Sequence, residues 1–96
     1  MEINLRTVKF SASEKLAALV EKKVGRLEKF FEGGFQKAEV TLEESKDGKK
    51  AKIQIHVPGE ELIIDRTAET FEAALTQCVD AMKEKITRVK EKNFQK

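Results

Sequence analysis

The spacing of apolar residues changes three times along the chain, and each change predicts a new kind of element. Apolar and polar side chains alternate over residues 1–10, which is the period of a half-buried strand. Apolar side chains then recur at steps of three and four to about Phe31, which predicts an amphipathic helix that Gly33-Gly34 ends. Alternation returns in the middle of the chain, and helical spacing returns in its last third.

Two turn signals divide the middle of the chain into three further strands. Residues 46–49, with the sequence KDGK, have the composition of a hairpin turn, and residues 58–60, with the sequence PGE, make a second turn. The strands predicted beside these turns are residues 35–43, 50–57 and 62–67.

Hydroxyl side chains mark where both helices begin. Thr70 is a good N-cap for the last helix, because it directly precedes the second run of helical spacing. Ser11 and Ser13 are both available to cap the first helix, and Ser13 is favoured because it stands next to the periodic run.

The predicted order of elements is β-α-β-β-β-α, which defines one α+β domain over residues 1–96. The first helix must cross over the sheet, so the strands that it joins pair in parallel, with a right-handed connection. The short turns make the remaining pairs antiparallel. Each helix has one apolar stripe, so both helices pack on one face of this four-stranded mixed sheet. The opposite face stays open and carries, from the third strand, Lys50, Lys52, Gln54 and His56.

Composition fits a single globular domain with its own core. Of the 96 residues, 38% are charged and 6% are aromatic, but the apolar residues are periodic, so disorder is not expected. Cys78 is the one cysteine and cannot form an internal disulfide, which favours a reducing, cytoplasmic setting. No apolar run approaches the roughly 18 residues of a membrane span, and residues 1–10 contain no apolar h-region, so export is not expected.

The sequence offers little for catalysis. A nucleophile needs a neighbouring base, and the predicted sheet separates Cys78 on the core stripe of the last helix from His56 on the open face. One histidine and one cysteine do not make a metal-ligand set, and there is no phosphate-binding glycine motif. We therefore predict a protein that is not an enzyme and has no cofactor or metal.

Basic residues form the one pattern that suggests a ligand. The net charge is +2, yet residues 83–96 alone hold six Lys or Arg against two Glu. Basic and acidic side chains fall on separate stripes of the first helix, which favours a nucleic-acid surface over solvated faces with i,i+4 pairs such as Glu84–Arg88. With no exposed aromatic platform expected, binding should follow the shape and backbone of structured RNA.

Helical angles divide the basic residues of the last helix between two flanks. One flank holds Lys83 and Lys90, and the other holds Lys85, Arg88 and Lys92. Only one flank can face the first helix, and the sequence leaves both alternatives open.

Three segments resemble a known family. The first helix starts with S-E-K-L at residues 13–16, and KKVGRLEKFF follows at residues 22–31. The last helix is similar to the family's F-x-A-[IV]-D-x-x-x-D-x-L-x-x-Q-[IL]-x-K-x-K-x-K pattern through Phe71, Ala74, Leu75, Asp80, Met82, Ile86, Arg88, Lys90 and Lys92. Together they resemble the short ribosome hibernation-promoting factors and ribosome-associated inhibitors of bacteria.

The resemblance implies both a fold and a function. The fold would be similar to the double-stranded-RNA-binding domain with an added first strand. The protein would bind the small ribosomal subunit between head and body, where mRNA and the A- and P-site tRNAs lie, and silence idle ribosomes under stress or in stationary phase. The rRNA contacts implied by position are Lys22, Lys23, Arg26, Lys29, Lys83, Lys85, Arg88, Lys90 and Lys92.

We also predict a cytoplasmic protein that is monomeric off the ribosome and binds neither DNA nor membranes. It would lack the C-terminal dimerisation domain of the long family members that it resembles. Thr76 departs from the pattern because it stands where the family usually has an Asp.

The alternative hypothesis is a protein-interaction module that uses the open sheet face and does not bind ribosomes.

Overall fold

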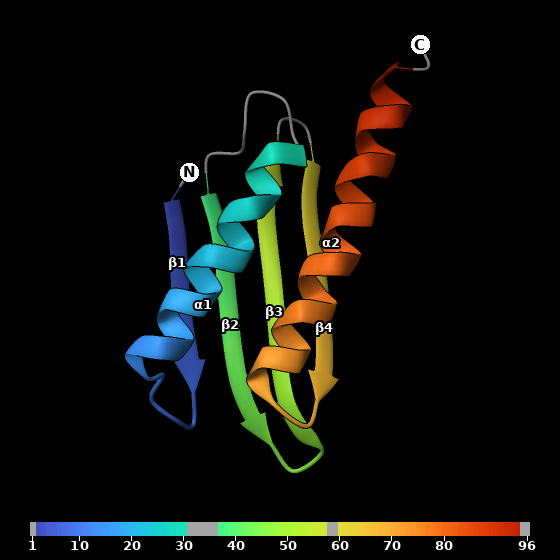
Figure 1. The fold of residues 1–96 in the computed structure, drawn as a ribbon. Coiled ribbons are helices and arrows are strands. Elements are labelled where there is room, and N and C mark those ends of the chain that lie inside the picture. The colour runs from blue at the N-terminus through green and yellow to red at the C-terminus, as the bar shows by residue number, and fades with distance from the viewer. Residues whose placement is uncertain (1, 31–36, 58–59, 95–96) are drawn as a thin grey trace.

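The computed structural model has the predicted element order (Figure 1). It describes residues 2–30, 37–57 and 60–94, and within them the side chains of residues 2–29, 37–56 and 61–88. The strands are β1 (Glu2–Val8), β2 (Lys37–Ser45), β3 (Gly48–Val57) and β4 (Glu60–Ala68). The helices are α1 (Glu14–Gly25), the short 3-10 helix η1 (Arg26–Phe30) and α2 (Phe71–Phe94).

The sheet has the predicted mixed topology. Its strands lie in the order β1-β2-β3-β4, with β1 and β2 parallel and the other two pairs antiparallel. Figure 1 shows α1 and α2 on the same side of the sheet, with α1 starting beside β1 and running across β2, and α2 lying over β3 and β4. The fold class is therefore confirmed.

Strand alternation places one set of side chains under the helices. Alternate residues of β2 and β3 are fully buried there, and they meet the apolar stripes of the helices. The core consists of Val20, Val24, Leu27, Ala38, Val40, Leu42, Ala51, Ile53, Ile55, Leu62, Ala74, Leu75, Cys78, Met82 and Ile86. Burying each large aliphatic side chain contributes roughly 1.5–3 kcal/mol, so this layer fixes the helices on the sheet.

The first helix ends earlier than predicted. Its α-helical part stops at Gly25, and the chain continues to Phe30 as a 3-10 helix, whereas the spacing predicted one helix to about Phe31. Glycine weakens an α-helix, and helices often tighten into 3-10 geometry at their C-terminal ends. The predicted stop at Gly33-Gly34 and the predicted turn at Pro58-Gly59 lie outside the described residues.

Both predicted caps are confirmed by hydrogen bonds. The Ser13 hydroxyl accepts from the backbone N–H of Leu16 at 3.1 Å, and the Thr70 hydroxyl accepts from the backbone N–H of Ala73 at 3.0 Å. The start of α2 is held further by Phe71, whose ring stacks on Phe10 with centroids 4.3 Å apart. These contacts fix where each helix begins and hence which residues face the neighbouring helix.

The hairpin between β2 and β3 follows the predicted turn. Gly48 has φ 138, and a Cβ built there would lie 2.8 Å from the backbone oxygen of Ala68. Only glycine fits this combination of backbone angle and close approach.

In the part of the chain that the structure describes, neither helix is long and apolar enough to cross a membrane.

Candidate nucleic-acid interface

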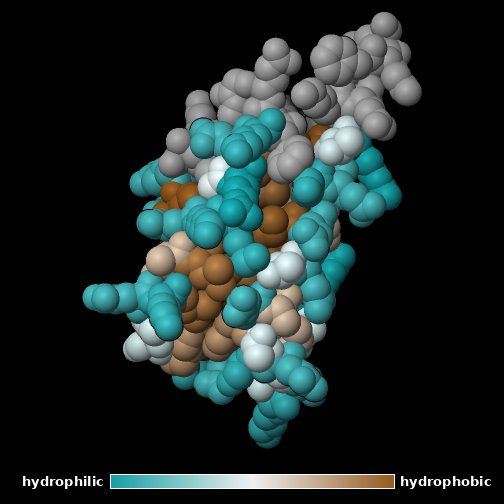
Figure 2. Space-filling view, viewed as in Figure 1, coloured by the Kyte–Doolittle hydropathy of each residue, from teal (hydrophilic) through white to brown (hydrophobic). Residues whose placement is uncertain are grey.

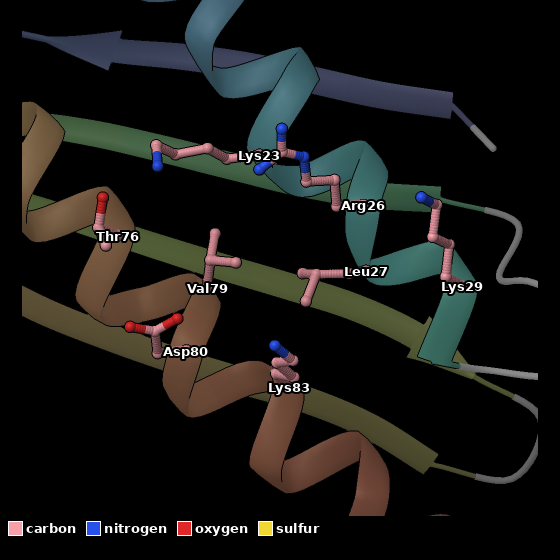
Figure 3. Close-up of a pocket in the computed structure, with 8 residues that line it drawn as sticks. All are labelled: Lys23, Arg26, Leu27, Lys29, Thr76, Val79, Asp80 and Lys83. Atoms are coloured by element: carbon pink, nitrogen blue, oxygen red, sulfur yellow. The ribbon is translucent and has the colours of Figure 1, made fainter.

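A groove of about 250 Å³ runs between the two helices (Figure 3). Leu27 and Val79 point toward one another across it and form its apolar floor. The remaining lining side chains are Lys23, Arg26 and Lys29 from α1 and η1, and Thr76, Asp80 and Lys83 from α2. Figure 2 shows the same side of the molecule, with apolar surface exposed between hydrophilic bands.

Helical periodicity explains why these residues meet. On α2, Thr76, Val79, Asp80 and Lys83 follow the i, i+3, i+4, i+7 spacing of one helix face. In η1, a 3-10 helix has three residues per turn, so Arg26 and Lys29 stand one above the other. The early end of α1 therefore aligns two cations along one rim of the groove.

The groove identifies the flank of α2 that faces α1. Lys83 lines the groove, so its flank is the one turned toward α1. Lys85 extends the other way, and its Nζ lies 3.4 Å from the backbone oxygen of Ile63 on the outer strand β4. Beside it, the Arg66 guanidinium donates to the backbone oxygen of Asp65 at 2.6 Å.

The structure brings together four of the nine predicted rRNA contacts: Lys23, Arg26, Lys29 and Lys83. Lys22 and Arg88 are exposed but are not among the lining residues, and Lys85 lies at the β4 edge. Lys90 and Lys92 belong to α2, but their side chains lie outside the described residues. The sequence prediction thus included all four cations of the groove, but it did not distinguish them from the five other predicted contacts.

Besides the apolar floor of Leu27 and Val79, two polar groove residues were not predicted as site residues. Asp80 is exposed on α2 and also lines the groove, whereas from the sequence it was named only as part of the family pattern. Thr76 was noted only as a departure from the family pattern. The available signal was the i+3 spacing of Thr76 to Val79 and of Asp80 to Lys83, which has meaning only once that flank is known to face α1.

The charge of the groove favours an anion. Four cationic side chains and the single carboxylate of Asp80 line it, which gives a formal charge of +3. Concave sites with apolar walls and charges of one sign focus the electrostatic field toward an oppositely charged ligand. This surface therefore suits phosphate groups.

The open sheet face has a different electrostatic character. Lys37 Nζ lies 3.4 Å from Glu39 Oε1, and His56 Nδ1 lies 3.2 Å from Glu61 Oε1. In the strand register, Glu43 stands opposite Lys50 and Lys52 stands opposite Asp65. Positive and negative groups alternate across this face, so it presents no field of one sign.

Cys78 and His56, the residues considered as nucleophile and base, lie on opposite sides of the sheet. The Cys78 thiol is buried, donates to the backbone oxygen of Ala51 at 3.0 Å and has its pKa raised to about 11, chiefly by burial. His56 is exposed on the opposite face of the sheet. Among the residues that the structure describes, no three His, Cys, Asp or Glu side chains are grouped as metal ligands would be.

The sequence of residues 3–93 matches the family described as Sigma 54 modulation protein / S30EA ribosomal protein. The chain belongs to this family. The match covers nearly the whole length and confirms the resemblance found in the helix motifs. None of the curated protein sequences compared with this S30EA-family chain gives a match.

Two solved structures have a similar fold. The N-terminal domain of Protein Y from Thermus thermophilus superposes with a TM-score of 0.83 at 24% identity, covering 93% of this chain and 99% of that one. A ribosomal subunit interface protein from Coxiella burnetii superposes with a TM-score of 0.85 at 15% identity, covering 95% and 99%. At these identities the likeness concerns the fold alone.

Proposed function

We propose that this S30EA-family protein is a non-catalytic ribosome hibernation factor of the cytoplasm. In this proposal residues 1–96 act as one ribosome-binding domain. The domain binds small-subunit rRNA in the channel that mRNA and tRNA would occupy, and so silences translation under stress or in stationary phase. Family membership supports a role at the ribosome, and so does the name of the Coxiella burnetii protein of similar fold, a ribosomal subunit interface protein.

The observation that carries this proposal is the convergence of cations from two helices on one groove. Phosphate backbones are bound by several Lys and Arg side chains gathered on one surface, with no further geometry required. Lys23, Arg26 and Lys83 supply such a surface between α1 and α2. An occluding protein needs only to occupy the channel, so no reacting group is required.

The test compares two variants with the same change in charge. The groove variant Lys23→Gln/Arg26→Gln and the open-face variant Lys50→Gln/Lys52→Gln each lower the net charge from +2 to 0. Hydrogen bonds to charged groups contribute roughly 1.5–3 kcal/mol each, so the groove variant should bind purified bacterial small subunits at least about tenfold more weakly. The open-face variant should bind like the unsubstituted protein. Binding is measured by co-sedimentation, and thermal melts confirm that both variants are folded.

Each other outcome has a definite meaning. Equal weakening of both variants would show that only net charge matters, and the groove would be rejected as the contact surface. Weakening of the open-face variant alone would support the protein-interaction alternative. The paired charges across that face give this alternative less support.

A further inference from the structure

Two features of the groove are not needed to bind a phosphate backbone. One is Asp80, a carboxylate among four cations, which weakens the attraction for phosphate. Within the described residues, no ion pair or hydrogen bond engages this carboxylate. The other is the apolar floor of Leu27 and Val79. A charged acceptor beside an apolar floor suits a flat polar molecule better than a phosphate alone.

The size of the groove limits what can enter. Its volume is about 250 Å³, whereas pockets for drug-sized ligands are roughly 300–1,000 Å³. The space therefore suits one nucleobase rather than a larger ligand. The exposed Arg26 guanidinium stands on the rim above the floor, and guanidinium planes stack on unpaired bases in RNA complexes.

We propose that this groove accepts a single unpaired guanosine of the bound RNA. The base lies against Val79, with the Arg26 guanidinium on its other face. The Asp80 carboxylate accepts from the Watson–Crick edge of the base, and Lys23 and Lys29 bind the flanking phosphates. This inference rests on the proposed function and deepens it, because it names the nucleotide that the surface reads.

The choice of guanine follows from the chemistry of the carboxylate. An ionised Asp has two oxygens that only accept hydrogen bonds. Guanine presents two adjacent donors on its Watson–Crick edge, N1–H and the N2 amino group, which match a carboxylate in bidentate fashion. Adenine and cytosine place a ring acceptor beside their amino donor, and uracil places a carbonyl on each side of its N–H. Those three bases would set a lone pair against Asp80.

The test uses RNA hairpins that carry one bulged nucleotide. Four hairpins differ only in the bulged base, G, A, C or U, and a fifth is fully paired. The unsubstituted protein should bind the bulged-G hairpin at least about tenfold more tightly than the others, because a good bidentate contact discriminates by roughly that factor. Fluorescence anisotropy with labelled hairpins measures this ratio.

Asp80→Asn is the deciding variant, and Glu84→Gln is its matched control. Both remove one negative charge from α2, but Glu84 is exposed and is not among the groove-lining residues. Asp80→Asn should reduce the preference for guanine to less than about twofold, since an amide replaces one acceptor by a donor. Glu84→Gln should keep the preference while strengthening binding to all five hairpins alike.

The outcomes separate this inference from the proposed function. Equal binding of all hairpins, or an unchanged preference in Asp80→Asn, would overturn the guanosine site. If ribosome co-sedimentation persists in that case, the proposed function stands without it. Conversely, a guanine preference lost in Asp80→Asn, together with no binding to small subunits, would support the site and reject the ribosomal role. The last measurement compares the affinity for GMP with that for the bulged-G hairpin. If GMP binds as tightly, the groove is a free-nucleotide site and the proposal for RNA fails.

Discussion

The thiol of Cys78 lies between α2 and the sheet, out of reach of solvent. Its Sγ is 3.0 Å from the backbone oxygen of Ala51 and 4.0 Å from that of Ile64. Burial penalises the thiolate and is the largest cause of the raised pKa, while the charge of Arg66 lowers it by a smaller amount. Nucleophilic cysteines have lowered pKa values, so Cys78 is suited to a structural role.

The raised pKa predicts how stability depends on alkaline pH. The thiol ionises near pH 9.0 in the unfolded chain and near 11 in the folded protein. Between these values only the unfolded chain loses its proton, so the contribution to the free energy of unfolding is fully present below pH 9 and declines as pH rises toward 11. At about 1.4 kcal/mol for each pH unit, the decline approaches about 3 kcal/mol.

Cys78→Ala isolates this effect from the titration of lysines. Denaturant unfolding at pH 8 should show the variant to be less stable, because the smaller side chain leaves a cavity. That deficit should shrink by about 2–3 kcal/mol by pH 11, since alanine does not titrate. A deficit that stays constant with pH would contradict the raised thiol pKa.

At the scale of the element, the two helix starts were predicted from single hydroxyl residues. Ser13→Ala and Thr70→Ala should each lower the free energy of unfolding by about 1 kcal/mol, because each removes the acceptor for one backbone N–H in the first turn. Ser11→Ala is the matched control for Ser13→Ala. It should change stability by less than about 0.5 kcal/mol, because the N-cap hydrogen bond comes from Ser13. Equal losses at the two serines would contradict the assigned cap.

Local sequence could define the two flanks of α2 but could not choose between them. Lys83 and Lys85 differ in helical angle by about 200°, and both flanks are basic, so nothing within the helix distinguishes them. The choice depends on the packing of α2 beside α1 and over β4, which involves residues far apart in the sequence. The change from α-helix to 3-10 helix after Gly25 could not be predicted either, because the periodicity of apolar residues does not indicate a change of helix type.

At the scale of the whole molecule, the fold could be predicted almost completely. Alternation over β2 and β3, the turn at Gly48 and one apolar stripe on each helix all agree with a single topology. The groove could not be predicted, because it depends on how far α2 is displaced along α1. A shift of one turn would remove Asp80 from the position opposite Lys23 and Arg26.

The charge distribution of the whole molecule predicts a strong effect of salt. If about six phosphates are contacted, the affinity for small subunits should fall about a thousandfold between 50 and 200 mM salt, because binding releases counterions from the RNA and this release is less favourable at higher salt. The groove variant Lys23→Gln/Arg26→Gln should show a shallower slope of log affinity against log salt, by about two units. Titrations of labelled protein at four salt concentrations measure both slopes. Affinity that is nearly independent of salt would contradict phosphate binding.

The contact between Lys85 and β4 also bears on how the protein resists aggregation. A free strand edge offers its backbone groups to any other extended chain, and an exposed apolar side chain beside it increases the risk. Ile63, 41% exposed, is such a side chain on β4. The cations of Lys85 and Arg66 occupy the neighbouring carbonyls of Ile63 and Asp65, so an incoming strand would have to displace both. The lysine that extends away from the groove thus covers part of the β4 edge and makes edge-to-edge pairing at this position less favourable.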